Sequence, residues 1–225
     1  EFLAEADGAI IGLETIDAAL LGACPRLQII SKYGVGLDNV DQEACRERGV
    51  AVGWTPGVNR RSVAEMTLGL MIGLCRNLFL TSLKLRSGLW DKDGGRQLSN
   101  RMIGIIGLGN VGQELVRLLK PFDCTILAND VQDRTRFCRE EGLTLATKDE
   151  VFSSAEIVTL HVPLNRETRH LVNPRTLDLM KSDAFLINTS RGGVVDQEAL
   201  KLTLQTQRIA GAAIDVYEQE PPTDR

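Results

Sequence analysis

The fold of this chain is decided by the stretch MIGIIGLGNVG, which occupies residues 102–112. Its first half is an apolar run typical of a buried strand, and its second half carries the glycine pattern GxGxxG. Gly107 permits a tight turn, Gly109 lets the backbone approach a pyrophosphate, and Gly112 lets the next helix pack closely on the strand. Phosphates would then bind the N–H groups where a helix begins, at Asn110–Val111. We therefore predict a dinucleotide-binding loop.

An acidic residue follows this loop at the expected distance. Asp130 comes directly after the apolar run 125–128, about twenty residues beyond the glycines. Its carboxylate can accept hydrogen bonds from the ribose hydroxyls of NAD and would repel the 2′-phosphate of NADP. The next basic residue is Arg134, so we predict NAD rather than NADP. Methyltransferases also combine a glycine loop with an acidic residue, so these two features leave the reaction open.

Apolar runs alternate with helical patterns on both sides of the loop. This alternation is typical of the α/β class, and specifically of a doubly wound parallel sheet. We expect strands at residues 9–11, 27–30, 50–52, 102–106, 125–128, 157–160, 184–187 and 210–214. We expect helices at residues 41–48, 111–120, 133–141, 175–181 and 197–207.

A long amphipathic pattern covers residues 61–79. We expect its apolar stripe to be buried, and the stripe consists of Val63, Met66, Leu70, Leu74 and Leu78. Residues 81–98 are mixed in character and are predicted to form a connecting arm. This arm has more apolar side chains than a linker needs, and either a second subunit or the same chain could cover them. They are Leu83, Leu85, Leu89 and Trp90.

The net charge, the lengths of the apolar runs and the cysteine spacing exclude several classes of binding partner and ligand. The net charge of −4 argues against nucleic acid or an anionic membrane surface as the main partner. No apolar run approaches the length of a membrane span. The five cysteines are scattered without metal-ligand spacing, so we expect reduced thiols in a cytoplasmic protein and no metal site.

Five further segments, in this order, narrow the class of protein. They are SKYGVGLDNVD at 31–41, TPGVN at 55–59, HVPL at 161–164, NTSRGGVVD at 188–196 and GAAIDVYEQEP at 211–221. Together with the glycine loop they closely resemble the D-isomer-specific 2-hydroxyacid dehydrogenases, a family that includes phosphoglycerate, glycerate, lactate, formate and phosphite dehydrogenases. The resemblance covers nearly the whole chain.

The resemblance implies an architecture and an activity. It implies an incomplete flavodoxin-like substrate domain over residues 1–72 and a Rossmann NAD-binding domain over residues 73–225. It further implies a homodimer that transfers hydride between NAD and C2 of a D-2-hydroxy acid, with 3-phosphoglycerate as one candidate. An NAD-sensing, corepressor-like binding protein and a phosphite or formate dehydrogenase remain as alternatives on the same fold.

Two residues are the predicted catalytic groups. Arg191 follows the apolar run 184–187, and its planar guanidinium matches a substrate carboxylate; the resemblance implies the same role. Glu220 matches the family's acid, which hydrogen-bonds a basic histidine in a Pro-His pair further downstream. We expect the chain to be truncated at both ends, and to be inactive in this form, since it stops before that pair. Its own histidines, His161 and His170, are expected to be structural or cofactor-adjacent.

The remaining site residues also follow from the family pattern. Predicted substrate-binding residues are Lys32, Gly34, Val35, Gly36 and Asn59, where the glycines would aim backbone N–H groups at a carboxylate. Arg60 departs from the pattern and is either a substrate contact or a surface residue. Predicted cofactor-lining residues beyond the loop and Asp130 are Thr55, Val162, Pro163, Thr189, Ser190 and Asp215.

Overall fold

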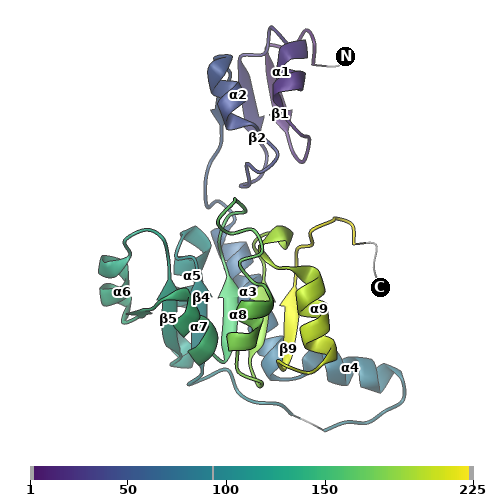
Figure 1. Cartoon of the computed structure of the whole chain (residues 1–225), viewed down its shortest axis with the longest axis vertical. Coiled ribbons are helices and arrows are strands. Elements are labelled where there is room, and N and C mark those ends of the chain that lie inside the picture. The colour runs from purple at the N-terminus through teal and green to yellow at the C-terminus, as the bar shows by residue number, and fades with distance from the viewer. Residues whose placement is uncertain (1–2, 93, 223–225) are drawn as a thin grey trace. The chain divides into compact units, whose positions relative to one another are not determined.

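A computed structural model describes residues 3–92 and 94–222 of the chain, and these form two compact units (Figure 1). The units are Glu1–Asn59 and Arg60–Arg225. The sequence predicted a division near residue 72, whereas the structure divides the chain between Asn59 and Arg60. The difference arises because the helix that begins at Arg60 packs against elements of the second unit.

The first unit is a small parallel sheet with helices. Its strands, in the spatial order β1-β2-β3, are Gly8–Ile11, Ile29–Lys32 and Ala51–Gly53. Its helices are α1 (Ala18–Ala23) and α2 (Gln42–Glu47). Asp17 and Asp41 cap these helices by accepting hydrogen bonds from backbone N–H groups in the first turn. Aliphatic side chains that include Ile30 form a separate core beneath the sheet.

The second unit is built on a six-stranded, entirely parallel sheet in the order β6-β5-β4-β7-β8-β9. The reversal of strand order at β4 confirms the predicted doubly wound fold. Each strand predicted for this block is present, and the short strand β6 was not predicted. The strands are β4 Met102–Ile106, β5 Thr125–Asn129, β6 Thr144–Leu145, β7 Ile157–Leu160, β8 Phe185–Asn188 and β9 Gly211–Ile214.

Helices cover both faces of this sheet, as alternate side chains of its strands require. Ile105 of β4 belongs to one core cluster, which includes residues of α3, α5 and α6, whereas Ile106 belongs to another, which includes residues of α7, α8 and α9. The helices are α3 Arg60–Cys75, α4 Leu78–Arg86, α5 Asn110–Leu119, α6 Thr135–Glu141, α7 Lys148–Ser154, α8 Pro174–Leu179 and α9 Gln197–Gln205. Short 3₁₀ turns cover Lys120–Phe122 and Gly192–Val194.

The buried stripe of α3 differs from the predicted one. The structure buries Ala64, Thr67, Met71 and Cys75, one position along from the predicted stripe. Met66 and Leu78 of the predicted stripe are exposed. The small Ala64 and Thr67 side chains let α3 approach its neighbours closely, and the larger Leu70 and Leu74 pack at the margins of the core. Side-chain size therefore decides which stripe faces inward.

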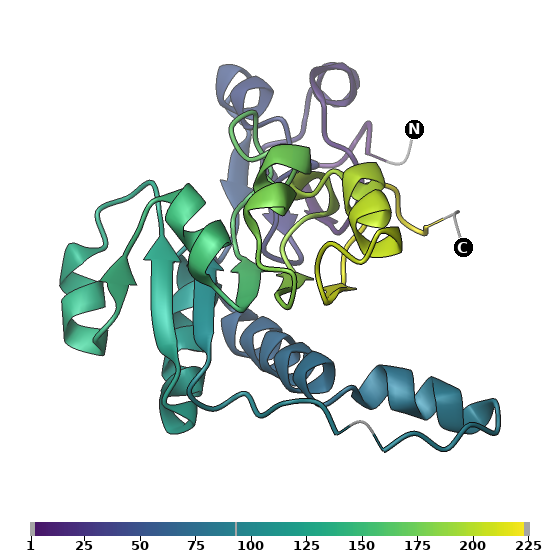
Figure 2. The same ribbon diagram turned by 60° about the horizontal axis from the view of Figure 1, so that its bottom comes forward.

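The pattern over residues 61–79 is also interrupted. Asn77 adopts a left-handed conformation, φ 53°, and separates α3 from α4 with a bend of 62°. The predicted arm therefore begins with a helix, which lies apart from the sheet in Figure 2. Within the described ranges no single helix is long and apolar enough to cross a membrane; α3 and α4 would qualify only if the bend between them were ignored.

Candidate functional site

Strand register brings the predicted cofactor residues of the second unit to one edge of its sheet. Ile106, Asn129, Leu160, Asn188 and Ile214 are neighbours across β4, β5, β7, β8 and β9. The residues that directly follow them therefore lie side by side at the carboxyl edge. Gly107, Asp130, His161, Thr189 and Asp215 occupy these positions. In doubly wound sheets this edge is where ligands bind.

The three glycines of the loop face three different surroundings. A Cβ at Gly107 would overlap the carbonyl of His161, and φ there is +100°. A Cβ at Gly112 would overlap the carbonyl oxygen of Gly107. At Gly109 no atom lies within 4 Å of the Cβ position. Two glycines thus allow close packing, while the third leaves open space at the N-terminus of α5, where a pyrophosphate can approach.

Asp130 is held against this loop by three contacts. Its Oδ2 accepts a hydrogen bond from the Leu108 N–H at 2.7 Å, and its Oδ1 accepts one from the Gln132 N–H at 2.7 Å. Arg134 Nε lies 3.4 Å from Oδ2. A cavity of about 380 Å³ opens beside these residues and is also lined by Ala146 and Thr147. The carboxylate thus contacts the glycine loop and lines this cavity.

The segment after β8 is organised by a buried asparagine that the sequence analysis missed. Asn188 is fully buried; its Nδ2 donates to the Arg191 carbonyl, and its Oδ1 accepts from the N–H and hydroxyl of Ser190. Thr189, also buried, shares a 2.9 Å hydrogen bond with Thr67 of α3. A polar side chain at the end of an otherwise apolar strand was the available signal. Asn188 fixes the backbone that carries Arg191.

Arg191 is partly buried, and its Nη1 donates to the Ser190 carbonyl at 2.7 Å. The next residue, Gly192, permits a close approach of chain segments, since a Cβ there would overlap the backbone of Tyr217. Arg191 is therefore next to the segment that follows β9, which contains Asp215. The register and this approach bring a cationic side chain to the same sheet edge as the glycine loop.

Glu220 lies on an exposed part of that segment. Its Oε1 accepts a hydrogen bond from the Tyr217 N–H at 3.0 Å. His170 instead pairs with Glu218, with 2.6 Å between Nε2 and Oε1. The catalytic role of Glu220 stays a prediction.

His161 is a partly buried base at the centre of this carboxyl edge. Its Nε2 lies 3.0 Å from the hydroxyl of the fully buried Thr159. Burial lowers the pKa of His161 to about 4 from an ordinary value of 6.5. The imidazole is therefore neutral near pH 7, in line with the structural or cofactor-adjacent role predicted for it.

This shift makes stability depend on pH. Between about pH 6.5 and pH 4 the unfolded chain binds a proton at His161 that the folded chain does not, so stability falls as the pH falls. The loss is at most about 3 kcal/mol, since His161 keeps some exposed surface. Denaturant unfolding near pH 7 and near pH 4.5 should show that His161→Gln removes this part of the dependence. His170→Gln is the control. Equal acid sensitivity in wild type and His161→Gln would contradict the assignment.

The predicted site residues of the first unit also lie beyond strand ends. Gly34, Val35 and Gly36 follow β2, and Thr55 follows β3. Trp54 Nε1 donates to the Val35 carbonyl at 2.8 Å, which joins the two loops. Gly34 has φ +114°, as a turn of this kind requires.

The Lys32 ammonium is engaged inside this unit. It contacts the Gly12 carbonyl and lies 2.9 Å from Asn39 Oδ1. Asn59 is the last residue of the unit. The substrate roles of all these first-unit residues stay predictions.

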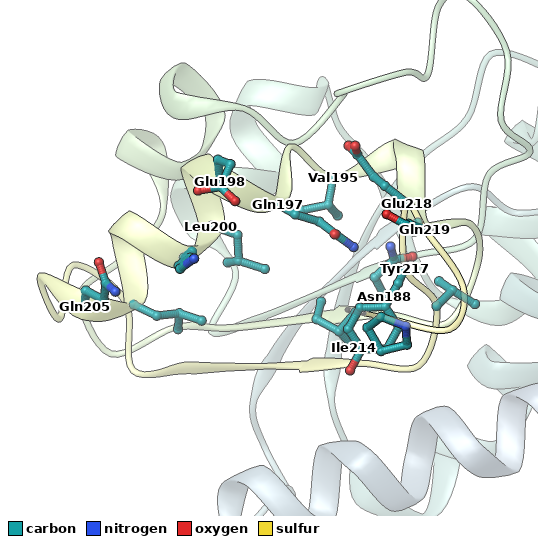
Figure 3. A pocket seen from close by; sticks show the side chains of 15 residues that line it. Asn188, Val195, Gln197, Glu198, Leu200, Gln205, Ile214, Tyr217, Glu218 and Gln219 are labelled. Carbon is teal, nitrogen blue, oxygen red and sulfur yellow. The ribbon is translucent and has the colours of Figure 1, made fainter. Parts of the chain in front are cut away.

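A larger cavity, of about 530 Å³, lies on the β9 side of the six-stranded sheet, between α9, β9 and the segment after β9 (Figure 3). Leu200 and Ile214 contribute apolar side chains to its lining, and Glu198 and Tyr217 also line it. Its position beside β9 separates it from the cavity at Asp130. In the described parts of the chain, no group of three or more His, Cys, Asp or Glu side chains could hold a metal ion.

A doubly wound sheet with a glycine loop and a loop-bound acid is typical of dinucleotide-binding proteins. Residues 68–225 match the family model described as "D-isomer specific 2-hydroxyacid dehydrogenase, NAD binding domain". The chain therefore belongs to the D-isomer specific 2-hydroxyacid dehydrogenase family, as the sequence motifs predicted. Its second unit is the NAD-binding domain of that family, with NAD as the cofactor.

Individual relatives support this assignment. A glyoxylate reductase of Thermofilum pendens is 40% identical over 92% of this chain and 63% of its own length. A hydroxypyruvate reductase of Thermotoga maritima is 35% identical over 100% of this chain and 73% of its own length. The structure of a D-lactate dehydrogenase from Aquifex aeolicus, complexed with NAD and lactic acid, superposes with a TM-score of 0.91. It is 30% identical, and the match covers 97% of this chain and 67% of that one.

Proposed function

We propose that the protein transfers hydride between NAD and C2 of a small D-2-hydroxy acid or its 2-oxo counterpart. The observation that carries the proposal is the arrangement at one sheet edge. The open space at Gly109 suits a pyrophosphate, the Asp130 carboxylate suits a ribose, and the Arg191 cation follows β8, which β7 separates from β4 in the same sheet. A pyrophosphate site at the same sheet edge as a cation that could bind a carboxylate fits the reactions that the relatives' names describe.

Each residue has a distinct role in this proposal. NAD, when bound, supplies the hydride acceptor or donor at its nicotinamide ring. Arg191 would bind the substrate carboxylate and stabilise negative charge on the C2 oxygen. Glu220 would hydrogen-bond a basic histidine of the kind that the family places downstream, and so favour its cationic form. Neutral His161 would remain a packing group beside Thr159.

The substrate is identified by measuring NADH absorbance with a panel of acids in the intact protein. The panel contains glyoxylate, hydroxypyruvate, pyruvate, 3-phosphoglycerate, formate and phosphite. Turnover of a 2-oxo or 2-hydroxy acid is the expected result. Turnover of formate or phosphite alone would contradict the proposed 2-hydroxy acid substrate and favour a formate or phosphite dehydrogenase. NAD binding without turnover of any member would favour an NAD-sensing binding protein and overturn the enzymatic proposal.

We also propose that the protein is a homodimer, and that α4 and the residues after it form part of the interface. All of α4 is unburied in the single chain, and the exposed apolar side chains of this region are Leu78, Phe79, Leu80, Leu83, Leu85, Leu89 and Trp90. Leu83→Glu should convert a dimer to a monomer in sedimentation velocity experiments, because it would bury a charge. Leu202→Glu, at an exposed leucine of α9, is the control. A monomeric wild type would contradict this proposal.

A further inference from the structure

A hydrogen-bonded pair of side chains joins two loops that follow strands of the six-stranded sheet. His170 lies on the loop after β7, and its Nε2 is 2.6 Å from Oε1 of Glu218, on the segment after β9. The two side chains are 38% and 34% exposed. The same segment carries Glu220, the acid proposed to hydrogen-bond a basic histidine. The pair therefore contacts this segment two residues away from that acid.

The backbone of His170 is held firmly on its side of the pair. Its N–H donates to the Gly193 carbonyl at 2.9 Å, and its own carbonyl accepts from Asn173 Nδ2 at 3.0 Å. The backbone has φ +48°, a left-handed conformation that histidine and asparagine adopt more readily than most residues. Because Gly193 is two residues from Arg191, the loop that presents the imidazole is anchored to the segment that carries this cation.

The other side of the pair belongs to a tight turn. A Cβ at Gly192 would overlap the carbonyl of Tyr217 and the backbone nitrogen of Glu218, so the turn begins against the backbone there. At its end, Glu220 Oε1 accepts from the Tyr217 N–H at 3.0 Å, and Oε2 can accept from another donor. Residues 217–222 are exposed. An exposed turn with few packing contacts opens easily unless side-chain contacts restrict it.

We propose that His170 and Glu218 are positioning residues, whose contact holds the turn at residues 217–220 where Glu220 can act. This inference rests on the role proposed for Glu220 and deepens it. Neither member of the pair would touch the substrate or the cofactor. The pair also engages one of the two carboxylates of the turn, so Glu220 is the one that remains available to a histidine.

His170→Asn tests the proposal, because asparagine tolerates the left-handed backbone and its shorter side chain loses the contact with Glu218. Single-turnover measurements of NADH absorbance in the intact protein, with the best substrate of the panel, report the hydride-transfer step. We expect its rate to fall about 10-fold, since small displacements of a catalytic group are costly, whereas KM and the Kd for NADH should change less than about 2-fold. The melting temperature should change by less than about 3 °C, because exposed pairs stabilise little.

Dependence on Glu220 distinguishes positioning from a general structural role. In a Glu220→Gln background, His170→Asn should cause less than about 2-fold further loss, since the group that the pair positions has already been removed. Glu218→Ala should lower the rate as His170→Asn does, and the two changes together should cost no more than either alone. Glu218→Gln should recover most of the rate, because its amide oxygen can still accept from the imidazole.

Glu140→Gln is the matched control. It breaks another exposed pair, in which Glu140 Oε1 lies 2.8 Å from Arg136 Nε on α6, and it should leave the rate unchanged. An unchanged rate in both His170→Asn and Glu218→Ala would overturn the positioning role, as would equal losses from His170→Asn with and without Glu220. Absence of turnover in the wild type, or an unchanged rate in Glu220→Gln, would instead overturn the proposed function and this inference with it.

Discussion

Replacing Gly109 by valine is expected to lower the affinity of the protein for NAD at least about 100-fold while leaving its fold intact. No atom of the protein lies within 4 Å of the Cβ position, and the extended backbone at Gly109, φ −74° and ψ −160°, is accessible to any residue. The added side chain therefore clashes only with a ligand that approaches the start of α5. Calorimetric titration with NADH measures the loss, and denaturant unfolding should show a change below about 1 kcal/mol.

Gly112→Ala separates this effect from a general loss of packing. Its methyl group would overlap the Gly107 carbonyl oxygen, so we expect a loss of about 3 kcal/mol in unfolding free energy together with weaker binding. Gly69→Ala is a control that we expect to raise, rather than lower, the free energy of unfolding. Nothing lies within 4 Å of its Cβ position on α3, and alanine should stabilise the helix by about 0.5–1 kcal/mol. If Gly109→Val binds NADH as wild type does, the pyrophosphate lies elsewhere.

Arg191→Gln is expected to lower kcat/KM of the intact enzyme about 1000-fold or more, with the Kd for NADH changed by less than about 3-fold. The glutamine keeps much of the volume but loses the charge that the proposal assigns to the substrate carboxylate. Arg191→Lys should recover only part of the loss, because an ammonium lacks the planar fork of a guanidinium. Steady-state kinetics with the best substrate of the panel provide the measurement.

A matched surface arginine tests whether this effect is specific. Arg166 is exposed on the loop after β7, and Arg166→Gln should leave both kcat/KM and the Kd for NADH unchanged. Equal losses of NADH affinity and kcat/KM in Arg191→Gln would indicate that Arg191 supports the loop after β8 rather than the substrate. That result would remove the main support for the proposed reaction.

Much of the second unit could be predicted from local patterns. Apolar runs bounded by glycines and polar residues placed β4, β5, β7, β8 and β9, because a strand covered on both faces must be apolar along its length. The spacing from the glycine loop to Asp130 then predicted an acid of the cofactor site, and the structure adds that its carboxylate accepts a 2.7 Å hydrogen bond from the Leu108 N–H. These features depend on residues close in sequence or on one repeated supersecondary unit.

Other features depend on partners far away in sequence. The inward face of α3 was predicted one position away from the observed stripe, since hydrophobicity alone does not show that Ala64 and Thr67 are small enough for close packing. The short strand β6 has a weak local signal and is fixed by pairing with β5. Helix α7 was not predicted, although the capping box of Thr147 and Glu150 marks its start in the sequence, and burial of Val151 and Phe152 fixes its position. The break at Asn77 likewise interrupts a pattern that continues in the sequence.

The sequence by itself determined the alternation of strands and helices, the glycine loop, the acid that follows it and the family, because each depends on residue type and short spacing. Only the tertiary structure decided that Gly192 admits the Tyr217 segment and that buried Thr189 shares a hydrogen bond with Thr67 of α3. These contacts join side chains through the register of parallel strands and the packing of loops. Such distances are set by the whole sheet, and no short stretch of sequence encodes them.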